Sequence, residues 1–204
     1  MLRNQLRPAI MLTFLLCIVT GVFYPGVVTA IAQLVFPKQA NGSLIMVNGR
    51  VVGSALIGQP FAQPYYFHPR PSAAGNGYDA TASGGTNKGP TDRKLADTLI
   101  AQAVSDVVAH DGAQKGKIPS DMVTSSASGL DPHISPANAQ LQLRRVAEAR
   151  GLTPARVRAI LDAHTERRQF GFFGEPRVNV LLLNIALDSA FGAPKPLPTA
   201  PAKQ

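Results

Sequence analysis

The longest apolar stretch of the chain lies near its beginning. The thirty residues of 8–37 include no charged side chain. A helix needs roughly 20 apolar residues to cross a hydrocarbon core about 30 Å thick, so this pattern predicts a transmembrane anchor over 8–37. Pro25 lacks an amide hydrogen and is expected to kink or end the tightest part of the span.

The charges beside the span predict its orientation. Arg3 and Arg7 precede it, whereas Lys38 follows it almost alone. The positive-inside bias then makes residues 1–7 a cytoplasmic N-terminus of a single-pass protein of the inner membrane, with the main domain in the periplasm. The alternative is a cleaved secretory signal ending at Ala30-Ile31-Ala32. The apolar run exceeds the roughly 7 to 15 residues typical of such signals, which favours the anchor.

Residues 38–192 predict one extracytoplasmic α+β domain with a β-hairpin, several helices and a long ordered loop. Residues 44–47 and 51–55 are β-leaning runs joined by Asn48-Gly49, which tolerates positive φ at both turn positions. Residues 58–90 are rich in Gly, Pro, Ser and Asn and cannot form a regular element. Because disordered linkers are poor in aromatic residues and this segment has five, we expect an ordered binding loop.

An apolar helix is predicted after this loop. Thr91 stands where a capping side chain begins a helix, and Gly112 stands where it ends. The apolar face is broad, so we expect this helix to belong to the core. Its apolar positions are Leu95, Ala96, Leu99, Ile100, Ala103, Val104, Val107 and Val108.

Two further helices are expected to pack as a hairpin. Ser135-Pro136 is an N-cap followed by proline at the first helical position, and this helix should stop at Gly151. Thr153-Pro154 repeats the start signal after a short turn. Apolar positions in 177–184 fit a buried final helix, with a strand through Val178 as the runner-up. The Pro-, Ala- and Lys-rich residues 193–204 predict a disordered tail.

The charge balance is basic, with a formal net charge of +8. Seven arginines gather in the second half of the chain, where they could bind anionic lipid or an acidic partner, or form a solvated helix face. No nucleic-acid partner is expected, since no basic motif is interleaved with aromatic residues. The seven are Arg144, Arg145, Arg150, Arg156, Arg158, Arg167 and Arg168.

Catalytic signatures are weak. The four histidines show no metal-ligand spacing, so no metal site is predicted. Ser126, Asp131 and His133 could be arranged as a hydrolase triad, but no glycine-flanked turn holds a serine as a nucleophile. A membrane-anchored or secreted hydrolase is therefore kept only as the alternative function.

An N-terminal Leu-Arg-Pro, the single span and seven further motifs carry a resemblance that covers nearly the whole chain. On these motifs the chain resembles the KdpC family, the C subunit of the Kdp-type potassium-transporting P-type ATPase. Lys88 replaces a usually apolar residue and Thr86 a commoner serine, which leaves the role of the loop intact. The motifs are residues 58–61 (GQPF), 66–73 (YFHPRPSA), 82–87 (ASGGTN), 89–91 (GPT), 128–136 (SGLDPHISP), 146–152 (VAEARGL) and 174–181 (GEPRVNVL).

The resemblance implies a non-catalytic accessory subunit of a high-affinity potassium uptake pump. Its implied partners are a channel-like potassium-binding subunit, an ATP-hydrolysing subunit, a small membrane subunit and membrane lipid. The chain lacks the Asp-Lys-Thr-Gly phosphorylation motif of the motor. The family is also described as a catalytic chaperone that raises the ATP affinity of the hydrolysing subunit. ATP and potassium are thus ligands of the complex, and no cofactor is assigned to this chain.

A contact surface is predicted from the two irregular stretches, 58–90 and 125–136. Their length, glycines and aromatic residues suggest backbone shaped into a surface, so we expect them to lie together and contact the channel-like subunit. The alternative is that their side chains only pin the loop onto its own domain. Candidate interface residues are Tyr66, Phe67, Arg70, Asn87, Asp131 and His133, with Tyr66, Phe67 and Arg70 as the expected anchors.

Overall fold

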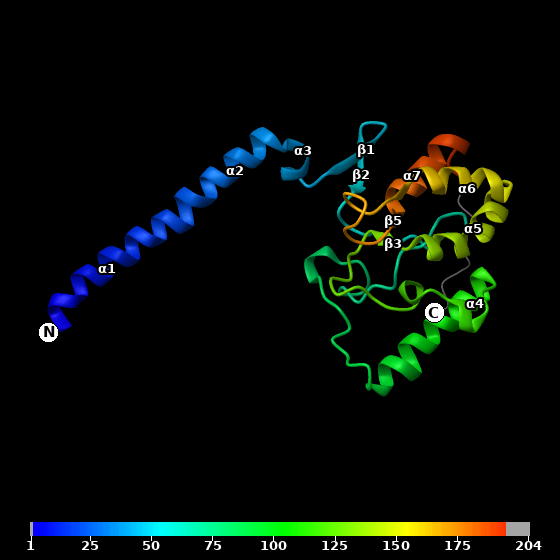
Figure 1. Cartoon of the computed structure of the whole chain (residues 1–204), viewed down its shortest axis with the longest axis horizontal. Helices are drawn as coiled ribbons and strands as arrows, with labels where there is room; N and C mark the ends of the chain where they lie inside the picture. Colours follow the sequence, from blue (N-terminus) through cyan, green and yellow to red (C-terminus); the bar gives the residue numbers. More distant parts are fainter. Residues whose placement is uncertain (1, 195–204) are drawn as a thin grey trace, which may run out of the picture. The chain divides into compact units, whose positions relative to one another are not determined.

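A computed structural model describes residues 2–194 of the chain (Figure 1). The chain divides into two compact units, Met1–Ser54 and Ala55–Gln204. The β-hairpin belongs to the first of these units. Of the predicted tail, residues 195–204 lie outside the described residues.

The first unit is dominated by a nearly continuous apolar helix. It consists of α1 (Leu2–Ile18), the π-helical η1 (Val19–Phe23) and α2 (Tyr24–Val35), and the short α3 (Pro37–Ala40) follows. By length and composition, Asn4–Val35 is long and apolar enough to cross a membrane, and none of its most apolar window is buried. A long apolar helix in this region is therefore confirmed, although it begins before Pro8 and ends before Pro37.

Pro25 perturbs this helix without ending it. The proline has no amide hydrogen, and its ring would collide with the carbonyl group four residues earlier in a regular α-helix. The wider turns of η1 lie immediately before it, and α2 then continues to Val35. The interruption predicted at Pro25 is thus a π-helical segment, which is a common way for a helix to accommodate an irregularity.

The hairpin has the predicted turn. β1 (Leu44–Val47) pairs antiparallel with β2 (Arg50–Ser54). Asn48 and Gly49 have φ of 52° and 75°, as a type I′ turn requires. The second strand begins one residue earlier and ends one residue earlier than the sequence indicated.

The core of the second unit is built from three helices and a small sheet. The helices are α5 (Pro136–Arg150), α6 (Pro154–Ala163) and α7 (Val180–Phe191). The strands β3 (His133–Ile134), β5 (Arg177–Asn179) and β4 (Thr165–Glu166) form an antiparallel sheet in the order β3-β5-β4. The mixed α and β character of this region is confirmed. Fully buried side chains include Phe67, Val146, Val157, Val178, Leu183 and Leu187.

The predicted helix hairpin is confirmed. The Ser135 hydroxyl accepts a hydrogen bond from the Asn138 amide at 3.1 Å, which caps α5. Gly151 ends α5 with φ of 64°, a conformation that glycine adopts without steric cost. Helices α5 and α6 then pack against each other through Val146 and Val157, among others.

Both alternatives for residues 177–184 are partly right. Residues 177–179 form β5, and the helix α7 begins at Val180. The Asn179 side chain explains the change, because its oxygen accepts a hydrogen bond from the Leu182 amide at 3.1 Å and caps the helix. The strand thus ends where the helix cap begins.

The helix after the long loop differs from its prediction in two ways. It comprises the π-helical η3 (Lys94–Ile100) and α4 (Ala101–Asp111), and Asp92, not Thr91, caps it by accepting from the amides of Lys94 and Leu95. None of its apolar residues is buried, and Leu99 is 41% exposed. The prediction that it belongs to the core is wrong, because α5, α6, α7 and the sheet already enclose the buried cluster.

Candidate functional site

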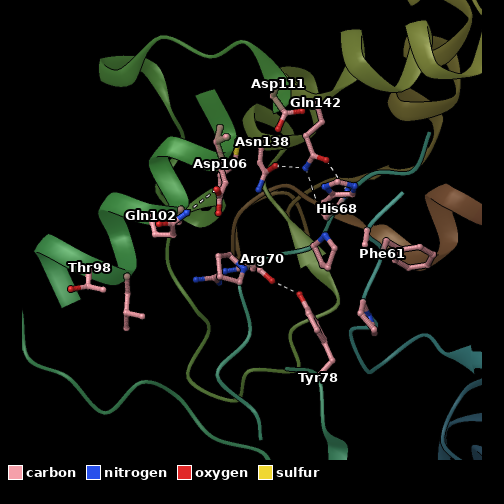
Figure 2. Close-up of a pocket in the computed structure, with 18 residues that line it drawn as sticks. Phe61, His68, Arg70, Tyr78, Thr98, Gln102, Asp106, Asp111, Asn138 and Gln142 are labelled. Atoms are coloured by element: carbon pink, nitrogen blue, oxygen red, sulfur yellow. Dashed lines mark hydrogen bonds between the residues drawn. The ribbon is translucent and has the colours of Figure 1, made fainter. Parts of the chain in front are cut away.

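The apolar face of η3 and α4 borders an open hollow of about 520 Å³ in the second unit. Figure 2 shows this hollow with the helix carrying Thr98 and Gln102 on one side and the loop with His68 and Arg70 opposite. Leu99, Ala103 and Val107 add apolar surface to the helical wall. The broad apolar face that the sequence predicts for this helix therefore lines a depression in the protein surface.

Buried amides form the base of the hollow and hold the loop. Gln142 of α5 accepts from the His68 amide at 2.7 Å and donates to the His68 carbonyl at 2.9 Å, as a neighbouring strand would (Figure 2). It also donates to Asn138 at 2.7 Å, and Asn138 donates to Asp121 at 3.0 Å. The otherwise irregular backbone at His68 is therefore hydrogen bonded and fixed to α5.

Arg145 joins three segments at the edge of the hollow. Its guanidinium donates to Asp111 at 2.7 Å, to the Tyr66 carbonyl at 2.9 Å and to Gln142 at 2.6 Å. Burial, reinforced by the Arg145 charge, lowers the pKa of His68 to about 4. His68 is thus neutral at neutral pH, and its ring forms a structural contact with the Gln63 carbonyl.

The two irregular stretches lie together, as the sequence predicted. The Gly58 amide donates to the Leu130 carbonyl at 2.8 Å, and the Gly84 amide donates to the Ser128 carbonyl at 2.9 Å. Gly129 has φ of 67°, and a Cβ atom there would lie only 2.7 Å from the Gly84 carbonyl oxygen. The loops are therefore interlocked so closely that glycine is required at this position.

Arg70 and Asp131 link these loops at a half-buried position. Arg70 Nη1 lies 3.2 Å from Asp131 Oδ2, and Arg70 also donates to the carbonyl groups of Thr124 and Ser125. The hydroxyl of Tyr78 donates to the Arg70 carbonyl. A hydrogen bond from His133, together with the Arg70 charge, lowers the pKa of Asp131. Three candidate interface residues, Arg70, Asp131 and His133, are thus brought together.

The other candidates lie elsewhere. Phe67 is completely buried in the core, so it cannot be an exposed anchor, and its backbone pairs with the Asn184 side chain at 2.9 and 3.0 Å. Tyr66 is half-buried and donates to Asp188 at 2.8 Å; burial and this carboxylate raise its pKa to about 12. Asn87 is exposed, with φ of 54°. For Tyr66 and Phe67, pinning the loop to its own domain is the role their contacts support.

The arginine cluster divides into two groups. The side chains of Arg145 and Arg150 are 8% and 2% exposed, and Arg150 pairs with Asp188 at 2.8 Å. Arg156 stacks over Phe191 at 4.7 Å, and the exposed Arg168 pairs with Glu175. Two of the seven are therefore structural residues of the second unit.

The hydrolase alternative has no support in this geometry. His133 Nδ1 lies 3.4 Å from Asp131, but the Ser126 hydroxyl lies 3.5 Å from the hydroxyl of Ser128. Within residues 2–194, no group of three or more His, Cys, Asp or Glu side chains could hold a metal ion. The arrangement therefore provides a binding surface, which consists of the partly apolar hollow and the Arg70–Asp131 ion pair beside it.

Sequence reasoning missed the residues that hold this surface in place. Asn138, Gln142 and Arg145 are polar yet buried, and they lie on α5 beside the buried Ala139 and Val146. Their spacing along the helix places them on one face. Polar residues that share a helix face with Ala139, Leu143 and Val146 were the available signal for a buried hydrogen-bond network.

Comparisons with known proteins agree over nearly the whole chain. Residues 6–189 match the family described as "KdpC: K+-transporting ATPase, c chain". A "Potassium-transporting ATPase KdpC subunit" of Gemmatimonas aurantiaca is 62% identical over 91% of this chain and 93% of the relative. Proteins with the same description from Koribacter versatilis and Rhodospirillum rubrum are 50% and 53% identical, covering 97% and 94% of this chain and 99% and 98% of theirs.

Proposed function

The chain belongs to the KdpC family of potassium-transporting ATPase subunits, and on that premise we propose that its second unit docks on the channel-like potassium-binding subunit of the pump. The chain is an accessory subunit of that ATPase, and it carries no Asp-Lys-Thr-Gly phosphorylation motif. The docking surface that we propose is the hollow beside η3 and α4 together with the loop junction at Arg70 and Asp131.

One observation carries this proposal: an apolar helix face that the fold leaves open. Leu99, Ala103 and Val107 line the hollow, and the helix contributes no apolar residue to the buried core. Apolar surface left in a concave, ordered depression is typical of binding sites. The Arg70–Asp131 pair is half-buried, with 23% and 30% of the side chains exposed, so a partner could complete its burial. Arginine is enriched among the residues that dominate interface energies.

The docking surface can be tested with one charge in the hollow. Leu99→Asp should abolish co-purification with the other pump subunits from detergent, because it would bury an unpaired carboxylate in the interface. Ala109→Asp is the matched control, since Ala109 is exposed on the same helix and does not line the hollow. Normal assembly of a folded Leu99→Asp variant, checked by circular dichroism, would reject this surface.

We further propose that the apolar helix anchors the chain in the inner membrane, with residues 1–7 in the cytoplasm and the second unit in the periplasm. The charge bias across the span and the membership in a membrane-pump family support this topology. A reporter active only outside the cytoplasm, fused after Gln204, should be active. A signal from a cytoplasmic reporter at the same position would reverse the orientation, and a mature N-terminus at Gln33 would establish cleavage.

In this topology the effect on ATP affinity that the family resemblance implies must be indirect. A subunit on the far side of the membrane can change the affinity of a cytoplasmic site only by favouring one state of a shared conformational equilibrium. Photoreactive ATP should therefore label the ATP-hydrolysing subunit and leave this chain unlabelled in the assembled pump. Labelling of this chain that excess ATP prevents would contradict the indirect route.

A further inference from the structure

Three phenylalanine rings are exposed on one tight turn between β4 and β5. Phe170, Phe172 and Phe173 are 88%, 65% and 57% exposed, and the rings of Phe172 and Phe173 lie 4.2 Å apart. Phe170 and Phe172 are the most exposed large apolar side chains among the described residues of the second unit. Single exposed apolar residues are common, but a contiguous group marks an interaction site. We call residues 169–173 the phenylalanine turn.

The turn is built to hold these rings outward. Gln169 and Phe173 exchange two backbone hydrogen bonds of 2.9 Å, which close it. Phe170 has φ of 51°, which is uncommon for a residue other than glycine. Arg168 and Glu175, which flank the turn, form an ion pair with 2.7 Å between Arg168 Nη2 and Glu175 Oε2. The backbone, rather than a loose loop, therefore sets the position of the rings.

The base of the turn lies close to the point where the chain enters the second unit. Arg177, which pairs with Glu166, begins β5, and Asn179 ends it two residues later. The Asn179 side chain donates to the Ala55 carbonyl at 2.8 Å. The phenylalanine turn is thus attached through β5 to the first residue of the unit.

That first residue is tied closely to the end of the apolar helix. Leu44 pairs with Ser54, so the hairpin returns the chain to its starting point. Only α3 and residues 41–43 separate the hairpin from Phe36. With about 1.5 Å per helical and 3.5 Å per extended residue, Ala55 lies within roughly 30 Å of the helix end. The connection is therefore short enough to let the base of the turn reach a membrane that the helix crosses.

We propose that the phenylalanine turn inserts into the surface of the membrane that the chain's own helix spans. The rings would enter the boundary between headgroups and acyl chains, and the exposed Arg167 and Arg168 would lie at the level of the lipid phosphates. All three rings are more than half exposed, which suits insertion into a fluid lipid surface. This inference rests on the proposed membrane anchoring.

The absence of tryptophan from the chain permits a direct test. The full-length Phe172→Trp variant is placed in nanodiscs made with ordinary or with brominated acyl chains, which quench tryptophan at close range. Tyr24→Trp, within the apolar helix, reports on lipid contact, and Leu99→Trp, on the separate helix η3 (Figure 1), reports on a surface away from the turn. Phe172→Trp should lose emission in brominated lipid to a similar extent as Tyr24→Trp, whereas Leu99→Trp should not.

Each other outcome has a defined meaning. Quenching of Tyr24→Trp alone would overturn the insertion while leaving the anchor intact, and a protein partner would then be the ligand of the turn. Failure to quench Tyr24→Trp would reject the membrane anchor itself, and the insertion with it. A second reporter, Phe170→Trp, guards against local distortion: insertion requires that it be quenched as well, since Phe170 is the most exposed ring.

Discussion

Arg145 and Asp111 form an ion pair of 2.7 Å in which both side chains are almost fully shielded from solvent, at 8% and 6% exposed. Asp111 is the last residue of α4, and Arg145 lies on α5. Arg145 also donates to backbone carbonyls of the long loop at Pro64 and Tyr66. One side chain therefore fixes the helix that borders the hollow and the loop opposite it.

Removing Arg145 should be costly. Arg145→Met leaves the Asp111 carboxylate buried without its partner, which typically destabilises a protein by about 3–5 kcal/mol. Urea unfolding of the full chain in detergent measures this loss. Arg144→Met is the control, because the exposed Arg144–Glu148 pair, at 3.9 Å, is of the kind that contributes about 0–1 kcal/mol. If adding Asp111→Leu to Arg145→Met restored no stability, the buried charge would not be the cause.

Gln142 should matter more than its exposed neighbour on the same helix. Gln142→Leu would leave the amide and carbonyl of His68 without partners, at a cost of about 1–3 kcal/mol for each buried group. Gln140→Leu makes the same change at an exposed position of α5. Hydrogen exchange should show faster exchange of the His68 amide in Gln142→Leu only. Unchanged exchange would mean that the loop is held elsewhere.

The cap of η3 can be assigned by two alanine substitutions. Asp92→Ala should lower the midpoint of thermal unfolding, because it removes the acceptor for the amides of Lys94 and Leu95. Thr91→Ala should have little effect. A lower midpoint in Thr91→Ala and an unchanged midpoint in Asp92→Ala would instead assign the cap to Thr91, as the sequence predicted.

Stability should decrease as the pH falls from about 6.5 to 4. The His68 pKa is about 4 in the folded chain, against 6.5 for an ordinary histidine, because burial disfavours the charged ring. The unfolded chain therefore binds a proton in this range that the folded chain does not. The full effect is on the order of 3 kcal/mol.

Unfolding measured from pH 4 to 7 checks this assignment. His68→Gln should flatten the dependence on pH in that range, even if it lowers stability overall. His110→Gln, at an exposed position of α4, is the matched control. A wild-type slope in His68→Gln would assign the effect to other groups.

Local signals in the sequence were sufficient for the features that local chemistry controls. The apolar run fixed the long helix, and Asn48-Gly49 fixed the hairpin because few residues tolerate two successive positive φ angles. Ser135-Pro136 and Gly151 marked the ends of α5 for similar reasons. The motifs at the two loops identified the family, which the comparisons confirmed.

Only the tertiary structure decided which apolar and charged residues are buried. Leu99 and Val107 have the helical spacing of core residues, yet the core is complete without them, so their face borders a hollow. Phe67 was expected at the surface and lies in the core. In the sequence Arg145 is one of seven similar arginines, and only its contacts with Asp111 and Gln142 in the folded chain distinguish it. Periodicity specifies which side chains share a face. What covers that face depends on contacts between residues far apart in the chain, which no local pattern encodes.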